Sequence, residues 1–306
     1  MNQHVPSSPR TVGVVGAGRV GAVVAARLRA AGHHVVAASG RSAATRTRVE
    51  TLLPGVPLTT AAQAADRSDL LVLAVPDDSL VGLVDELAAD GHLRPGQVVL
   101  HTSGRHGLAA LASAAAAGAR PVAMHPAMTF TGTDVDLDRL SGCVFGLTVG
   151  DDDAALAESL VADLGGRPVR IPEDRRTAYH AALAHGSNHL VTLVAQSMDL
   201  LRATGADDPS ALLRPLLQAA LDNVLAYGSA ALTGPVVRGD VDTVAAHLAA
   251  LADAPASTHD AYVAMARATT DRAVTDGRLT PSRGSDVRRV LDEADWDTMA
   301  DLAAGL

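Results

Sequence analysis

The stretch TVGVVGAGRVGAVVAARLRAAGHHVVAAS at residues 11–39 decides the fold. A short run rich in β-branched residues, 11–15, leads into the glycine-rich turn GAGRVG at 16–21. An alanine-rich segment of helical character follows to about Ala31, and a second strand-like run begins at His33. Strand, tight turn, helix and strand in this order predict one βαβ unit of the kind that binds dinucleotides.

Each of the three glycines in the turn answers a separate steric need. Gly16 permits the tight turn, Gly18 lets a pyrophosphate approach the backbone, and Gly21 allows the helix to pack closely on the strand. Phosphates then lie at a helix N-terminus, where free N–H groups and the helix dipole favour negative charge. The turn, with Arg19 and Val20, is therefore the predicted phosphate-binding loop. A glycine turn with a purely structural role is the alternative.

Strand-like and helix-like segments alternate up to Ile171, and helical segments alone follow from Pro172. Such alternation is typical of a mostly parallel sheet with helices between its strands. The sequence therefore predicts an α/β fold, with a doubly wound Rossmann-type domain at residues 1–171 and an all-helical domain at residues 172–306. The further strand-like runs are 70–75, 98–101, 122–124, 144–149 and 168–171.

The composition is that of a globular protein, with 48% hydrophobic and 19% charged residues. Lys and Arg together number 25 against 34 Asp and Glu, and no basic stripe marks a nucleic-acid binder. Cys143 is the single cysteine, and residues 1–10 lack the apolar core of a signal peptide. No apolar run approaches the ~20 residues of a membrane helix. We expect a soluble, cytoplasmic protein without a nucleic-acid or membrane partner.

The end of the second strand favours NADP(H) over NAD(H). An NAD-preferring protein normally presents Asp or Glu there to the ribose hydroxyls, whereas this chain reads SGRS at 39–42. Arg41 can meet a 2′-phosphate with a planar set of donors, and Ser39 or Ser42 can add a hydroxyl. Alternatively, Arg41 begins a solvated, arginine-rich helix that contains Arg46 and Arg48.

Three more polar loops follow strand-like runs, namely AVPD at 74–77, HTSG at 101–104 and HPAMTF at 125–130. The carboxyl ends of parallel strands meet at one sheet edge, which is where open α/β folds bind ligands. Asp77 can equally cap a helix. The residues expected to line the cofactor are Val75, Pro76, Asp77, Thr102 and Ser103.

Two histidines belong to these loops. A lone histidine is more often structural, which is the favoured interpretation of His101. His125 stands beside a rigid proline at another strand end and is a candidate catalytic group. Neither has a cysteine or carboxylate at metal-ligand spacing, so we expect no metal site.

The segment RRTAYHAALAHGSNHLVTL at 175–193 opens the helical half with many polar groups. On a helix of ~3.6 residues per turn, Arg176 and His180 lie near one face, and Asn188 lies to its side. Their partners can be a substrate carboxylate and carbonyl, or neighbouring backbone. His185 and His189 fit core or dimer contacts better. Further along, Thr233 and Arg238 either reach the cleft or belong to a structural loop.

The motifs GAGRVG, SGRS, AVPD, HTSG, HPAMTF, YHAALAHGSNHL and LTGPVVRGD, in this order, resemble those of bacterial Rossmann-like proteins with a C-terminal helical domain of unknown function. This group is related to the pyrroline-5-carboxylate, ketopantoate and 6-phosphogluconate reductases and dehydrogenases. The resemblance implies an NADP(H)-dependent oxidoreductase, often dimeric, that reduces a small ketopantoate-like 2-oxo acid or an imino acid.

Within this resemblance, Arg176 would hold the substrate carboxylate, Asn188 would bond the reacting atom, and His125 or His180 would supply a proton. The chain departs from its relatives at two lysine positions, which correspond to Ala184 and Arg176. Arginine is effectively never deprotonated, so a histidine must act as the acid. A sensor or scaffold protein that binds NADP(H) without turnover is the alternative function.

Overall fold

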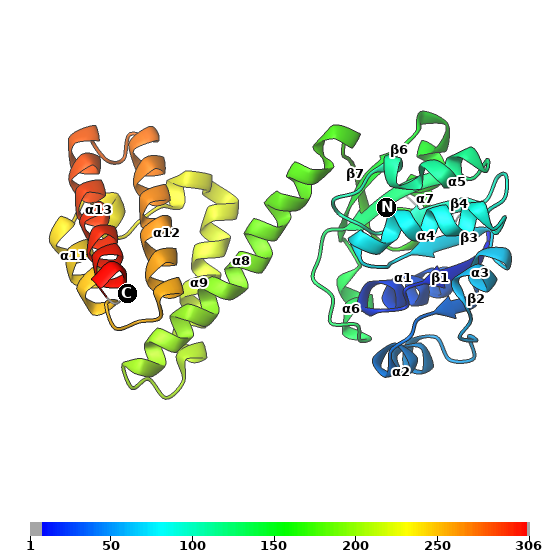
Figure 1. Cartoon of the computed structure of the whole chain (residues 1–306), viewed down its shortest axis with the longest axis horizontal. Helices are drawn as coiled ribbons and strands as arrows, with labels where there is room; N and C mark the ends of the chain where they lie inside the picture. The colour runs from blue at the N-terminus through cyan, green and yellow to red at the C-terminus, as the bar shows by residue number, and fades with distance from the viewer. Residues whose placement is uncertain (1–7, 305–306) are drawn as a thin grey trace. The chain divides into compact units, whose positions relative to one another are not determined.

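The computed structural model describes the backbone of residues 8–304 and the side chains of residues 8–293. The chain forms two compact units that divide between Gly186 and Ser187. The first unit contains a sheet covered by helices, and the second contains helices (Figure 1).

The first unit is built on a seven-stranded sheet with the order β2-β1-β3-β4-β5-β6-β7. All neighbouring strands are parallel except β5 and β6, so the predicted mostly parallel sheet is confirmed. Each strand-like run of the sequence became a strand. The strands are β1 Thr11–Val15, β2 His34–Ser39, β3 Leu70–Leu73, β4 Val98–His101, β5 Arg120–Pro126, β6 Val144–Val149 and β7 Arg167–Arg170.

Helices cover both faces of this sheet because the buried strands are apolar on both sides. Alternate residues of β3 illustrate this: Leu70 and Val72 belong to one core cluster, and Leu71 and Leu73 to the other. The doubly wound prediction is therefore confirmed. The helices are α1 Arg19–Ala30, α2 Ala43–Leu52, α3 Ala61–Asp66, α4 Asp77–Ala89, α5 Ala112–Ala116, α6 Val135–Arg139 and α7 Ala154–Asp163, with short 3₁₀ turns η1 Leu108–Leu111, η2 Asp151–Asp153 and η3 Glu173–Arg175.

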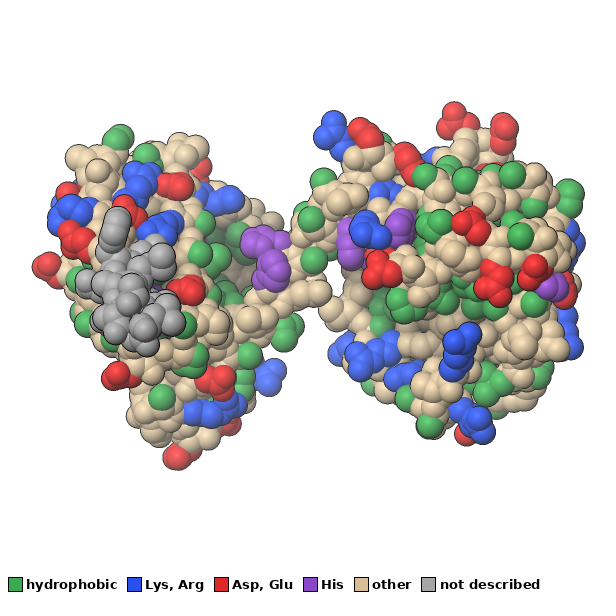
Figure 2. Space-filling view, in the orientation of Figure 1, with side chains coloured by type: hydrophobic (Ala, Val, Ile, Leu, Met, Phe, Trp, Pro, Cys, Tyr) green, Lys and Arg blue, Asp and Glu red, His purple; other side chains and the backbone are tan. Residues whose placement is uncertain are grey.

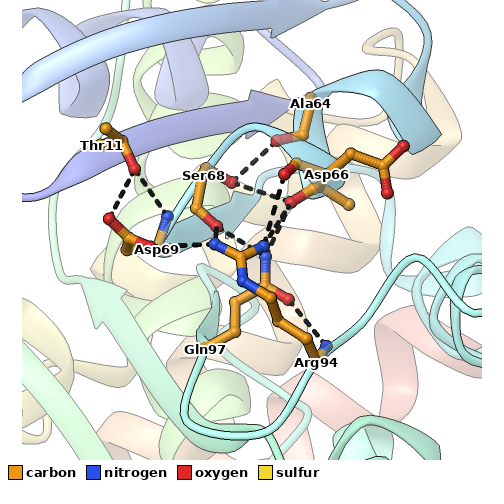
Figure 3. A network of polar contacts seen from close by, with 8 residues as sticks. Thr11, Ala64, Asp66, Ser68, Asp69, Arg94 and Gln97 are labelled. Carbon is orange, nitrogen blue, oxygen red and sulfur yellow. Dashed lines mark hydrogen bonds and ion pairs between the residues drawn. The ribbon is translucent and has the colours of Figure 1, made fainter.

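The amino-terminal edge of the sheet is closed by a polar network (Figure 3). Arg94 donates from Nη2 to the carbonyl of Ser68 at 2.7 Å and to Oδ1 of Asp69 at 2.9 Å. Gln97 donates to the Ser68 carbonyl at 2.8 Å, and the Thr11 hydroxyl donates to Asp69 at 2.7 Å. These bonds join Thr11, the first residue of β1, to the segments that precede β3 and β4, so they tie these strands together at the edge opposite their carboxyl ends.

The second unit is helical, as predicted, and has a small core of its own. α8 spans Arg176–Ala203, so its first turns belong to the first unit. β7 ends at Arg170, just before the predicted domain boundary at 171/172. The other helices are α9 Pro209–Tyr227, α10 Pro235–Arg238, α11 Val241–Ala250, α12 Ala256–Thr275 and α13 Pro281–Ala304, with η4 at Gly228–Ala231; the core residues are Val244, Leu248, Val263, Ala266, Val287 and Leu291.

Candidate active site

The glycine-rich turn has the geometry that a dinucleotide phosphate needs. Gly16 has φ +85°, and a Cβ there would lie 2.5 Å from the carbonyl oxygen of Ala74. A Cβ on Gly21 would clash with the Gly16 carbonyl, so helix and strand pack in contact. A Cβ on Gly18, in contrast, would have only the Gly16 oxygen near it, at 3.9 Å. The backbone at Gly18 therefore faces open space.

The N-terminus of α1 is free to bind an anion. The helix begins at Arg19, its N-cap Gly18 offers no side-chain hydrogen bond, and its first turn contains no acidic residue. The first N–H groups of a helix, here including that of Val20, have no partner within the helix. The turn is tied to β2 because the N–H groups of Gly16 and Ala17 donate to the Ser39 carbonyl at 3.0 and 2.8 Å. The loop is compatible with a bound pyrophosphate.

At the end of β2, Arg41 lies outside α2, contrary to the alternative in which it begins that helix. Ser42 is the N-cap, and its hydroxyl accepts from the N–H of Thr45 at 3.1 Å. Ser39 is half-buried, whereas Arg41 is exposed. Arg41 forms no ion pair with any residue in 8–293. It remains available for an added phosphate.

The loop after β3 reaches the same edge of the sheet. Val75 is half-buried and Pro76 exposed. The N-cap of α4 is Pro76, so Asp77 is the first helical residue rather than the cap. Asp77 lies 3.9 Å from Nε of Arg105, which follows β4.

Polar groups in the loop after β4 form hydrogen bonds with other groups of the protein. The N–H of Thr102 donates to the Leu73 carbonyl at 3.1 Å. Ser103 is buried, and its hydroxyl accepts from the N–H of His106 at 3.1 Å. The Ser103 hydroxyl therefore stabilises its own turn in this structure.

His101 is a structural residue, as the favoured interpretation predicted. Its fully buried ring accepts from the N–H of Ser103 at Nδ1, 3.2 Å away. Nε2, which then carries the proton, donates to the carbonyl of Gly107 at 3.0 Å. Burial lowers the pKa of His101 to about 4. The neutral imidazole thus fixes the loop that follows β4.

A cluster of His125, Tyr179, His180 and Gly104 joins the carboxyl ends of β4 and β5 to the first turns of α8. Nδ1 of His125 lies 3.0 Å from the hydroxyl oxygen of Tyr179. The rings of His125 and His180 lie edge to face, with centroids 5.9 Å apart. Gly104 packs between the histidines, because a Cβ there would lie 2.6 Å from Cδ2 of His180 and 3.1 Å from Nε2 of His125. Figure 2 shows histidine side chains at the surface of the first unit.

The hydrogen-bonded pair of this cluster, His125 and Tyr179, carries no charge. Burial, then the positive charge of Arg176, lowers the pKa of His125 to about 4. Burial also raises the pKa of Tyr179 above its ordinary value. Both groups are therefore neutral near pH 7, and one hydrogen bond joins the phenol oxygen to Nδ1 of the imidazole, with the histidine tautomer deciding which group donates.

The guanidinium of Arg176 donates hydrogen bonds to other groups of the protein. Its side chain is 1% exposed, and Nη2 donates to the Ser103 carbonyl at 2.6 Å. Nη1 donates to the Thr148 hydroxyl at 3.0 Å and to the Gly146 carbonyl at 3.4 Å. These bonds tie α8 to β6 and to the loop after β4. In this conformation the guanidinium is not open to a substrate carboxylate.

The structure brings together His125, Arg176 and His180, but it does not place all the predicted residues in one site. Asn188 belongs to the second unit, where it accepts a hydrogen bond from the Ser187 hydroxyl at 3.0 Å. His189, Thr233 and Arg238 also lie in that unit. Arg238 pairs there with Asp240 at 2.8 Å.

Tyr179 and Gly104 were not singled out from the sequence. Tyr179 is three residues from Arg176 in α8 and so shares its face, a spacing that was visible in the sequence. Its position opposite His125 was not visible, because it depends on Gly146. His125 and Gly146 are partners across β5 and β6, and a Cβ on Gly146 would lie 2.6 Å from the Tyr179 hydroxyl.

Across residues 8–293, no three His, Cys, Asp or Glu side chains gather in a way that could hold a metal ion. Among the helices of the described chain, none combines the length and apolar character needed to cross a membrane.

The chain is similar to solved structures over most of its length. A protein from Bacteroides fragilis, provisionally named an NADP oxidoreductase, is 20% identical, with a TM-score of 0.73, 85% of this chain covered and 98% of the other. A reductive aminase from Aspergillus terreus, solved with NADPH and ethyl levulinate, is 20% identical, with a TM-score of 0.65 and coverage of 92% and 99%. An imine reductase from Myxococcus stipitatus with NADP⁺ is 20% identical, with a TM-score of 0.63 and coverage of 93% and 99%.

Two family models match consecutive parts of the chain. Residues 2–126 match the Rossmann-like domain, and residues 143–269 match a domain of unknown function, DUF2520. None of the curated proteins compared with the chain matches it. The first match ends with β5, and the second includes β6 and β7 of the sheet together with the helices from α8 into α12. The chain therefore contains a Rossmann-like domain followed by a DUF2520 domain.

Proposed function

We propose that this protein is an NADP(H)-dependent oxidoreductase that reduces the C=N bond of a small imino acid, or the C=O bond of a related 2-oxo acid. The single observation that carries the proposal is the neutral His125–Tyr179 pair, 3.0 Å apart, at the end of β5. This pair can deliver a proton at the sheet edge where the glycine-rich turn at the end of β1 offers a cofactor site.

NADP(H) is the cofactor that the residues fit. The open backbone at Gly18 and the free N-terminus of α1 suit a pyrophosphate, and the exposed Arg41 suits a 2′-phosphate. The Aspergillus and Myxococcus structures contain NADPH and NADP⁺. When bound, the reduced nicotinamide supplies a hydride.

Tyr179 is the proposed proton donor. The given sequence contains no lysine, so a lysine cannot act as the acid. With the His125 proton on Nδ1, this nitrogen donates to the Tyr179 oxygen and leaves the phenolic proton for the substrate. The Tyr179 proton adds to the nitrogen or oxygen of the double bond, the Nδ1–H of His125 stabilises the phenolate that remains, and a proton from water then restores the phenol.

An imine is the favoured substrate class. An imine reductase, a reductive aminase and a pyrroline-5-carboxylate reductase from other organisms share this fold. A weakly acidic phenol also suits a basic imine nitrogen. Recognition of a substrate carboxylate was predicted for Arg176, but its buried bonds suit a positioning role. The role of Asn188 and the cytoplasmic location stay predictions.

The test has two steps. First, thermal unfolding is followed with NADPH, with NADH and without ligand, since a ligand that binds only the native state raises the melting temperature. Second, NADPH oxidation is followed with a cyclic imino acid and with ketopantoate. A shift with NADPH followed by turnover supports the proposal. A shift without turnover on any imine or keto acid favours the sensor, and no shift with either nucleotide overturns the cofactor assignment.

We also propose that the protein forms a homodimer through α8 and α9. Only Pro209 of α9 is buried, although the helix is rich in leucine. Arg214, Gln218 and Asp222 form one polar stripe along α9, but most of its other positions are apolar, and an apolar helix surface of this size is normally covered. A second copy of the chain can cover it, and light scattering on the wild type and a Leu216→Glu variant tests this. Among residues 8–293, the most exposed large apolar residues are Val191, Leu212, Leu216, Leu225 and Tyr227.

A further inference from the structure

A buried carboxylate organises the loop that follows β5. Asp136, in α6, is fully buried, and its Oδ2 accepts from the N–H groups of Thr131 at 2.8 Å and Gly132 at 2.7 Å. Oδ1 accepts from the Thr131 hydroxyl at 3.1 Å and lies 3.7 Å from Nη1 of Arg139. A carboxylate that accepts several such bonds holds a loop in one conformation. The segment 131–134 is thus fixed at its base.

This loop lies against two arginines. Gly132 is buried with φ +83°, and a Cβ there would lie 2.7 Å from Nε of Arg48 and 2.9 Å from Cγ of Arg19. The same Cβ would lie 3.1 Å from Cα of Arg19, the first residue of α1. Gly132 therefore brings the side chain of Arg48, from α2, to the N-terminus of α1. Only a glycine fits this conformation and this space.

The two arginines have no acidic partner. Within residues 8–293, neither Arg19 nor Arg48 forms an ion pair or a side-chain hydrogen bond. Like charges held side by side repel each other, and an anion between them removes the repulsion. Figure 2 shows arginine side chains gathered over the part of the first unit that holds α1 and α2.

We propose that Arg48, held beside Arg19 by the loop 131–134, binds a phosphate group of the dinucleotide, and that Asp136 is the positioning residue for this loop. The inference rests on the proposed cofactor and adds a second phosphate-binding arginine to Arg41. The phosphate is either the 2′-phosphate or the pyrophosphate, because Arg48 comes from α2 whereas Gly132 touches the start of α1. Both groups would accept the same charge-assisted hydrogen bonds.

The experiment measures the Kd of NADPH and of NADH by calorimetry for the wild type and Arg48→Ala. Loss of a charge-assisted bond is expected to raise the Kd by about 10- to 100-fold. A loss of affinity for NADPH alone shows that Arg48 binds the 2′-phosphate. An equal loss of affinity for both nucleotides shows that it binds the pyrophosphate. Arg46→Ala is the control, since it removes the same charge from an exposed position of α2. A variant Arg48→Ala with unchanged Kd, or an equal loss in Arg46→Ala, overturns the proposal.

Asp136 is tested by a double-mutant cycle. Asp136→Asn is expected to weaken NADPH binding in the otherwise wild-type protein but to cause no further loss in the Arg48→Ala background. Both changes remove the same contact, that of Arg48 with the phosphate. Full additivity would show that Asp136 does not act through Arg48. If Asp136→Asn does not fold, Gly132→Ala is used in the same cycle, since its Cβ displaces Arg48.

Failure of the cofactor proposal gives a different result. A wild type that binds neither nucleotide overturns the proposed function. Inorganic pyrophosphate is then titrated into the wild type and Arg48→Ala. Binding that is lost in the variant keeps the arginine pair as an anion site, whereas no binding to the wild type overturns this inference as well.

Discussion

Nδ1 of His125 and the hydroxyl oxygen of Tyr179 lie 3.0 Å apart, and this contact joins β5 to α8. Burial keeps the phenol protonated and the imidazole neutral, so the pair holds one transferable proton without a net charge. The contact requires that the partner of His125 in β6 is Gly146, because any larger residue there would displace the phenol.

Tyr179→Phe removes the proposed donor and keeps the ring. We expect kcat to fall by about 10²- to 10⁴-fold with little change in KM, which is the usual contribution of a general acid. Steady-state oxidation of NADPH with the imine substrate measures both constants. Tyr262→Phe is the matched control, since Tyr262 lies 2.8 Å from Nδ1 of His247 in the second unit. Equal activity of Tyr179→Phe and wild type would exclude Tyr179 as the donor.

Gly104→Ala tests whether the contact between the two histidines matters. The added Cβ would lie 2.6 Å from His180, so we expect the ring to move and kcat to fall by about 10-fold or more. Gly82→Ala is the control, because nothing lies within 4 Å of its Cβ in α4. That variant should be stabilised by up to about 1 kcal/mol. Unchanged kinetics for Gly104→Ala would mean that His180 has no role in the reaction.

The sequence predicts the sheet domain well because its signals are local. The glycine turn, the strand-like runs and the change to helices after Pro172 each depend on neighbouring residues, and all three are found in the structure. His125 and His180 were both identified as candidates, and the fold brings them together.

The interior of the site could not be predicted in the same way. The contact of Tyr179 with His125 depends on the register between β5 and β6, and their pairing is antiparallel. Arg176 was expected to bind a ligand, but three protein oxygens surround its guanidinium. These oxygens belong to residues 103, 146 and 148, so a local pattern around position 176 does not contain them.

Arg176→Ala is expected to destabilise the first unit by about 3 kcal/mol or more. It leaves a cavity and removes the donors for Ser103 and Thr148, and each unsatisfied buried group costs about 1–3 kcal/mol. Urea unfolding measures the change, and the exposed neighbour Arg175→Ala should stay within about 0.5 kcal/mol of wild type. Unchanged stability, with a raised KM for a carboxylate substrate but not for its ester, would assign Arg176 to substrate binding instead.

His101 should make the fold sensitive to acid. Burial lowers its pKa to about 4 in the folded chain from the ordinary value of 6.5, so the unfolded chain binds the proton more readily. Stability is therefore complete above pH 6.5, falls as the pH drops from 6.5 to 4, and loses nothing more from this group below pH 4. At 1.36 kcal/mol for each pKa unit, the loss is about 3 kcal/mol. Urea unfolding between pH 7.5 and 4.5 measures how steeply the free energy of unfolding falls with pH. This slope should be smaller in His101→Gln than in wild type, whereas His34→Gln, at an exposed position, should keep the wild-type slope. Identical slopes in all three proteins would show that protonation of His101 is not linked to folding.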